Sequence, residues 1–159
     1  ESRLFDMLDP SSRWLKFPRD TEVIITDTVG FIQDLPKELQ VAFRATLEEL
    51  ENADVLLHVI DVSNPAYGRQ VASVERILED LDLGRIPVLN VLNKTDRIDA
   101  EAISRRVAEI GGIPVCARRP ETLHPLIAQM EAAVAGNAIQ VAQGVDALPT
   151  ENARVRMFS

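Results

Sequence analysis

Residues 87–96 read Pro-Val-Leu-Asn-Val-Leu-Asn-Lys-Thr-Asp, a mostly apolar run that changes abruptly into polar residues. Consecutive apolar residues are typical of a strand that is covered on both faces, as in a parallel sheet between helices. Two other runs also end at a polar residue: residues 23–26 precede Asp27, and residues 55–60 precede Asp61. Residues 113–116 predict a short fourth strand, and residues 13–17 predict an additional edge strand.

The segments between these strands have the spacing of helices. Apolar residues recur every three or four positions at residues 39–50, 71–81, 100–110 and 123–134. Glycines after three of these segments, Gly84, Gly111 and Gly136, predict where the helices end. Alternating strands and helices predict an α/β, three-layer sandwich with a mostly parallel sheet. Because the helical spacing weakens after Gly136, we expect a domain at residues 1–136, and a linker and C-terminal tail at residues 137–159 with a strand at 153–158.

Length and composition fit a single domain of 159 residues. The chain has 25 acidic and 17 basic residues and a formal net charge of -8, which argues against direct DNA binding. No apolar run approaches the ~18 residues that span a bilayer, so no membrane association is expected. The single cysteine, Cys116, fits a reducing compartment, and the expected localisation is cytoplasmic.

The polar strand ends predict one binding site, because ligands of open α/β sheets gather where the parallel strands end. Asp96 can accept hydrogen bonds from the N1–H and the 2-amino group of guanine, a donor pair that adenine lacks. Asn93 can tie the loop to its neighbours, and the stem of Lys94 can lie over the base. Together with the pattern Asp27-x-x-Gly30, these residues predict a guanine-nucleotide site.

Longer stretches around these motifs carry a family resemblance. The run Asp-Thr-Val-Gly-Phe-Ile-Gln-Asp-Leu-Pro at residues 27–36, with residues 42–49 and 53–65, resembles the HflX family of ribosome-associated GTPases. The similarity extends from about Leu4 to Asp96. It implies a P-loop NTPase-like fold, GTP or GDP and Mg²⁺ as cofactors and, in the whole protein, GTP hydrolysis on the ribosomal 50S subunit.

The resemblance also implies roles for matching residues. Asp27 corresponds to the residue that holds Mg²⁺ through a water, and Gly30 to the one whose N–H senses the γ-phosphate. Asn93, Lys94 and Asp96 correspond to the guanine-binding residues. Cys116 and Ala117 stand where the family has Ser-Ala, with the Ala117 N–H on the base oxygen.

The segment from Phe31 to about Arg44 corresponds to a mobile switch. Phe31 cannot form the hydrogen bond that orients an attacking water, so hydrolysis is expected to be slow without a partner. No residue is assigned as the catalytic group.

Two features depart from the family. The chain has no Gly-Lys dipeptide and therefore no phosphate-loop motif, and Met7 stands where a metal-binding Thr is usual. We expect the chain to start within the first switch, without the first strand, phosphate loop and first helix, and to bind nucleotide only at about millimolar affinity. The family places the missing strand between those ending at Asp27 and Asp61, so exposed edges and self-association are expected.

Two alternatives remain open from the sequence. One is a degenerate, non-hydrolysing domain that acts through protein contacts, and a phosphate loop upstream of Glu1 would argue against it. The other is a receiver domain phosphorylated on Asp61 with Lys94 as its partner, which inertness to acetyl phosphate would exclude. Trp14 and Phe17 are both expected in the core, and His58 and His124 predict no metal site.

Overall fold

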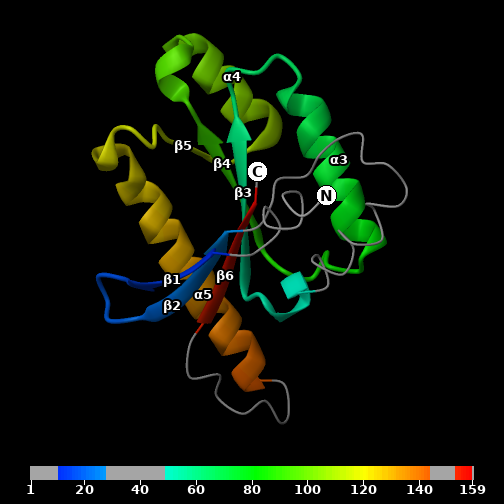
Figure 1. Ribbon diagram of the computed structural model, residues 1–159, viewed down its shortest axis with the longest axis vertical. Helices are drawn as coiled ribbons and strands as arrows, with labels where there is room; N and C mark the ends of the chain where they lie inside the picture. Colours follow the sequence, from blue (N-terminus) through cyan, green and yellow to red (C-terminus); the bar gives the residue numbers. More distant parts are fainter. Residues whose placement is uncertain (1–10, 28–48, 144–152, 159) are drawn as a thin grey trace, which may run out of the picture.

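The computed structural model of the chain describes residues 11–27, 49–143 and 153–158. Its strands are β1 (Ser11–Lys16), β2 (Glu22–Asp27), β3 (Val55–Asp61), β4 (Val88–Asn93), β5 (Ile113–Pro114) and β6 (Ala153–Phe158). They form one sheet in the order β1-β2-β6-β3-β4-β5. Only β1 is antiparallel to its neighbour, so the parallel strands all end at the same edge of the sheet (Figure 1).

Helices cover both faces of this sheet, which confirms the predicted three-layer α/β sandwich. The α-helices are α3 (Tyr67–Asp80), α4 (Ala100–Ile110) and α5 (His124–Gln143), and the 3₁₀ turns are η1 (Glu49–Asn52), η2 (Thr95–Arg97) and η3 (Pro120–Leu123). Figure 1 shows α5 and α3 on opposite sides of the sheet. Asp99 caps α4 by accepting the Ala102 N–H at 2.7 Å, an ordinary helix start.

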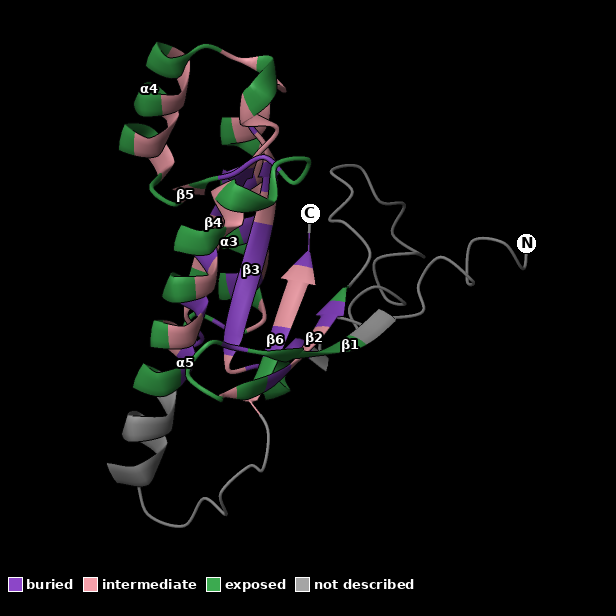
Figure 2. Cartoon of the chain, turned by 90° about the vertical axis from the view of Figure 1, so that its left-hand side faces the viewer, coloured by how far each residue is buried: buried purple, intermediate pink, exposed green. Residues whose placement is uncertain are grey.

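Each face of the sheet has its own apolar core. Successive residues of β3 point alternately into one core and then the other. On one face, Leu57 of β3 packs with Leu126, Met130 and Val134 of α5. On the other face, Leu56 packs with Val74 and Leu78 of α3. The central strand β3 is therefore almost fully buried, as Figure 2 shows. This double burial explains its continuous apolar sequence.

Most of the predicted elements are confirmed, with differences at their ends. The strands expected at residues 23–26, 55–60 and 87–92 are β2, β3 and β4, and the edge strand is β1. The strand expected at residues 113–116 is only two residues long, and the helix expected at 123–134 continues to Gln143. Of the helix expected at residues 39–50, only the last residues lie within the described part, in η1.

The C-terminal segment corrects two expectations. Residues 153–158 do form a strand, but this strand pairs in parallel with β2 on one side and β3 on the other. It therefore lies in the centre of the sheet and is not part of a tail. The edges of β2 and β3 that were expected to be exposed are paired, and Val155 and Phe158 of β6 are fully buried. Self-association through those edges has no basis in this arrangement.

The edge strand β1 corrects a third expectation, since only one of its two aromatic neighbours is in the core. Phe17 is 2% exposed and packs in the α5-side core, whereas Trp14 is 64% exposed. Trp14 pairs with Ile24 of β2, but β1 has no strand beyond it in the described sheet. Among the described residues, no helix is long and apolar enough to cross a membrane.

Candidate functional site

The polar residues at the strand ends meet at one edge of the sheet, as predicted. Asp61 ends β3 and is directly in register with Asn93 at the end of β4. Asp27 ends β2 on the same edge and is exposed. The edge therefore presents polar side chains from three separate segments of the chain.

Asn93 joins the end of β4 to the loop that follows β5. Its Oδ1 accepts the Ala117 N–H at 3.1 Å, a hydrogen bond between residues far apart in the sequence. The family resemblance implies that the Ala117 N–H donates to an oxygen of the base. A bound base would therefore share this donor with Asn93 or replace Asn93 as its acceptor. Thr95 adds a second tie, because its hydroxyl donates to the Val115 carbonyl at 3.0 Å. These two hydrogen bonds hold the two loops side by side.

The loop that contains Cys116 is held by a threonine that sequence reasoning missed. The Cys116 N–H donates to Thr122 Oγ1 at 2.9 Å, and this hydroxyl lies 2.8 Å from the Arg119 carbonyl oxygen. Cys116 itself is 2% exposed, so its side chain packs inside, whereas Ala117, the next residue of the loop, is exposed. The spacing of Cys116 and Thr122 in the sequence carries no signal for this contact.

Asp96 and Lys94 are the side chains that can act on a base. Asp96 lies in η2 and is exposed, and its carboxylate has no hydrogen-bond partner among the described residues. Both of its oxygens can therefore accept the paired N–H donors of guanine. Lys94 has a left-handed backbone conformation, with φ 65°, and its Nζ lies 2.6 Å from Asp61 Oδ2.

Asp61 is charged at neutral pH in this setting. Partial burial opposes ionisation, but hydrogen bonds from Lys94 and Ser63 outweigh it and hold the pKa of Asp61 below its usual range. The Ser63 hydroxyl donates to Asp61 Oδ1 at 2.6 Å, and the Ser63 N–H donates to the same oxygen at 3.0 Å. Each carboxylate oxygen thus has its own partners.

The phosphate side of the predicted site lies mostly outside the described residues. Gly30, Phe31, the expected switch to about Arg44, and Met7 all fall there. Within the described segments, no group of three His, Cys, Asp or Glu residues could hold a metal ion. Of the residues that the resemblance assigns to the base, the described chain contains Asn93, Lys94, Asp96, Cys116 and Ala117, whereas of those that it assigns to Mg²⁺ and the phosphates it contains Asp27.

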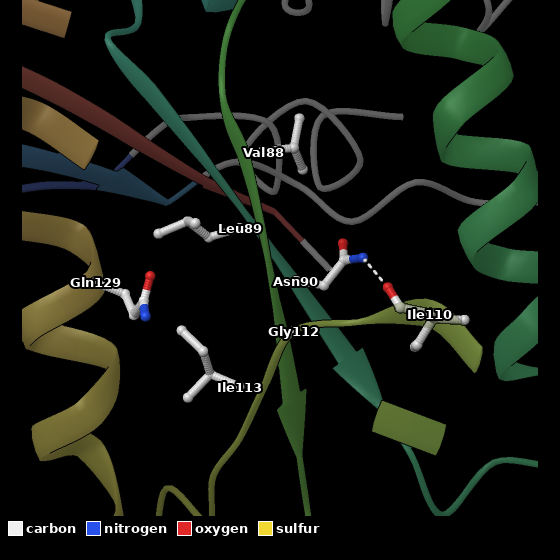
Figure 3. Close-up of a pocket in the computed structure, with 7 residues that line it drawn as sticks. All are labelled: Val88, Leu89, Asn90, Ile110, Gly112, Ile113 and Gln129. Carbon is white, nitrogen blue, oxygen red and sulfur yellow. Dashed lines mark hydrogen bonds between the residues drawn. The ribbon is translucent and has the colours of Figure 1, made fainter. Parts of the chain in front are cut away.

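A separate cavity of about 340 Å³ lies along β4, away from the strand ends. Figure 3 shows it at the place where β5 leaves β4, with Leu89, Ile113 and Gln129 on one side. Asn90 and Ile110 line the other side, and the Asn90 amide donates to the Ile110 carbonyl at 3.0 Å. The amide is used within the fold, so this cavity has no feature that points to a ligand.

Comparison with known proteins decides between a GTPase domain and a receiver domain, since the Asp61–Lys94 pair by itself fits both equally well. Residues 5–94 match the family described as 50S ribosome-binding GTPase. The chain belongs to this GTPase family. Within it, the chain carries an HflX-type G-domain sequence, and the receiver alternative is wrong.

Individual relatives agree with this assignment. GTPase HflX of Magnetococcus marinus is 42% identical over 135 residues, which are 84% of this chain and 31% of that protein. GTPase HflX of Caldanaerobacter subterraneus is 50% identical over 99 residues, 62% of this chain and 23% of the relative. The corresponding protein of Escherichia coli is 41% identical over 97 residues, 61% of this chain and 23% of the relative.

The fold has a counterpart among solved structures. The crystal structure of an SsGBP variant superposes with a TM-score of 0.70 at 23% identity, over 87% of this chain and 52% of that one. This likeness concerns the fold alone. Since the chain spans about a third or less of the HflX relatives, the activity of a whole protein is a matter for proposal.

Proposed function

We propose that this chain binds the base of GTP or GDP at the loops after β4 and β5, with Asn93, Lys94 and Asp96 as the guanine-binding residues. The observation that supports it most is the exposed Asp96 carboxylate, which has no hydrogen-bond partner within the described ranges and lies beside two loops joined by the Asn93–Ala117 hydrogen bond. A carboxylate there favours guanine, because adenine would leave it without donors. Cys116 contributes only its backbone.

For the whole protein, we propose GTP hydrolysis in association with the ribosomal 50S subunit, as the family description suggests. We also propose a cytoplasmic location, where such a partner and a reduced Cys116 would be found. Asp27 would hold Mg²⁺ through a water and Gly30 would contact the γ-phosphate. The Mg²⁺ would supply charge neutralisation at the phosphates when it is bound. The chain by itself is expected to bind weakly and to hydrolyse no GTP.

One observation favours a non-hydrolysing, protein-binding domain as a second candidate. Strand β6 makes the described sheet continuous by pairing with both β2 and β3. Met7, Phe31 and Cys116 depart from residues that are usual in hydrolysing GTPases, and they favour the same interpretation. The two candidates differ in whether hydrolysis occurs, but they share the base site.

The base site can be tested by titrating the 159-residue chain with GMP, IMP and AMP and following backbone amide signals by NMR. We expect GMP to shift the signals of Asn93 to Asp96 and Ala117 with a dissociation constant of about 1 mM, IMP to bind more weakly, and AMP to bind least. IMP lacks the 2-amino group, so it tests one of the two Asp96 contacts.

Variants separate the base contact from general charge effects. Asp96→Ala should weaken GMP binding by about tenfold or more and abolish the preference for GMP over IMP. Asp99→Asn is the matched control, because it removes a carboxylate on the same loop and leaves the cap of α4 to an asparagine. Equal binding of GMP and AMP by the unaltered chain would refute the proposed function.

A further inference from the structure

One ion pair connects the loops that follow β3 and β4. Lys94 Nζ lies 2.6 Å from Asp61 Oδ2, and the side chains are 42% and 31% exposed. Two other ion pairs, Lys16–Asp20 and Glu101–Arg105, join positions four apart, within one hairpin or one helix. The Asp61–Lys94 pair is therefore the one in the described chain that fixes a proposed binding side chain against a different element.

Asp61 is itself held firmly enough to act as an anchor. It ends a strand that is in parallel register with β4 up to the pair Asp61 and Asn93. Its other oxygen accepts two hydrogen bonds from Ser63, one from the hydroxyl and one from the backbone. The two hydrogen bonds from Ser63 therefore fix the orientation of the carboxylate independently of Lys94. The second oxygen, Oδ2, accepts from Lys94 Nζ.

Lys94 is the residue that needs such an anchor. Its φ of 65° places a non-glycine residue in the left-handed region, which costs about 1 kcal/mol or more unless the surroundings compensate. A lysine side chain also has many rotamers, so an unanchored stem would sweep over a wide volume. Pairing with Asp61 fixes the ammonium end of the stem and so limits the rotamers that the stem can adopt.

We propose that Asp61 is a positioning residue that holds Lys94 across the base site, so that the aliphatic stem of Lys94 forms a preordered platform for the base. The inference rests on the proposed guanine site, because Asp61 affects the base only by positioning Lys94. Asp61 makes no contact with the base. It adds affinity by removing the cost of ordering the lysine when nucleotide binds.

The positioning itself can be tested without nucleotide. In the unaltered chain we expect a distinct NMR signal for the Lys94 side-chain ammonium, slowed in exchange by its pairing with Asp61. Asp61→Asn should abolish that signal and keep the fold, because an asparagine oxygen can still accept from Ser63. Asp99→Asn should leave the signal unchanged. Persistence of the ammonium signal in Asp61→Asn would overturn the proposal.

Binding measurements then test the consequence. Asp61→Asn should weaken GMP binding by roughly two- to fivefold, the range expected for a partly exposed pair, while the preference for GMP over IMP stays unchanged. A merely structural defect would reduce that preference too. Lys94→Met keeps an unbranched stem without the charge, and in this background Asp61→Asn should have no further effect. An equal loss in both backgrounds, or tighter binding in Asp61→Asn alone, would overturn the proposal.

The two proposals fail in distinguishable ways. If no variant binds GMP and the ammonium signal still depends on Asp61, the guanine site is refuted and the placement of Lys94 by Asp61 stands. If GMP binds and Asp61→Asn neither weakens it nor alters the ammonium signal, the guanine site stands and the positioning role is refuted.

Discussion

At the scale of single residues, the most unusual group outside the site is a histidine in the middle of the sheet. His58 of β3 is 3% exposed, and its ring stacks on Phe158 of β6 with centroids 5.1 Å apart. Burial lowers the pKa of His58 to about 4, and a hydrogen bond with Asn90 of β4 acts in the opposite direction without offsetting it. The histidine is therefore neutral in the folded chain at physiological pH.

This neutral histidine should make the stability depend on pH. As the pH falls from about 6.5 towards 4, the unfolded chain gains a proton at His58 and the folded chain does not. The free energy of unfolding should then fall by up to about 3 kcal/mol more in the unaltered chain than in His58→Gln. Urea unfolding of both proteins at about three pH values between 7.5 and 4 measures this difference in the free energy of unfolding.

A second histidine provides the control for that prediction. His124 is exposed at the start of α5, so His124→Gln should follow the pH profile of the unaltered chain. A His58→Gln profile parallel to that of the unaltered chain over the whole range would show that His58 titrates equally in both states, against the prediction.

At the scale of elements, the connection between α4 and β5 depends on a glycine. Gly112 has φ +99°, and a Cβ atom there would lie 2.4 Å from the Asn90 carbonyl oxygen and 2.6 Å from Leu92 Cδ1. Figure 3 shows this close approach of the Gly112 backbone to β4. Because the obstacle is backbone, the chain cannot yield by turning a side chain.

Gly112→Ala should therefore destabilise the chain by about 2 kcal/mol or more, through both the left-handed backbone and the clash. Gly136→Ala is the matched substitution, since Gly136 lies in α5 with nothing within 4 Å of the added carbon. It should stabilise the chain by about 0.5–1 kcal/mol, because alanine favours a helix. Thermal unfolding of both variants gives the comparison, and similar midpoints for the two would contradict this account.

The sequence predicted the central strands and the helices α3 and α4 well because the signals for these elements are local. The apolar runs before Asp27, Asp61 and Asn93, and the spacing of α3 and α4, each arise from burial that repeats within a few residues. The exposure of Trp14, and a pairing of Asp61 with Lys94 within a GTPase domain, were not predicted, since both depend on which element lies next to them. Exposure of Trp14 follows from the position of β1 at the edge of the sheet, which no local pattern records.

At the scale of the whole molecule, the sheet is completed by the last strand of the chain. Residues 153–158 predict a strand from their own sequence, but the pattern does not say that this strand lies between β2 and β3. Parallel pairing joins segments far apart in the sequence. The partners of β6 are therefore determined by which apolar strand edges the rest of the fold leaves unpaired. Val155 packs with the α5-side core and Phe158 with the α3-side core, so β6 connects both layers.

Replacing Val155 tests this central place of β6. Val155 is fully buried, so Val155→Ala should cost about 2 kcal/mol, and Val155→Asp should cost more because it buries an unpaired carboxylate. Arg154→Gln changes the preceding, exposed side chain and should leave stability nearly unchanged. Urea unfolding of the three variants measures these differences.

Removing β6 extends the same argument to association. Deletion of residues 153–159 would free the facing edges of β2 and β3, and unpaired apolar edges in the middle of a sheet invite pairing with a second chain. Light scattering coupled to size-exclusion chromatography should then show association that increases with concentration in the deleted chain. The full chain and Arg154→Gln should show no such increase. A deleted chain that stays monomeric, together with a Val155→Asp variant as stable as Arg154→Gln, would mean that β6 does not occupy the centre of the sheet.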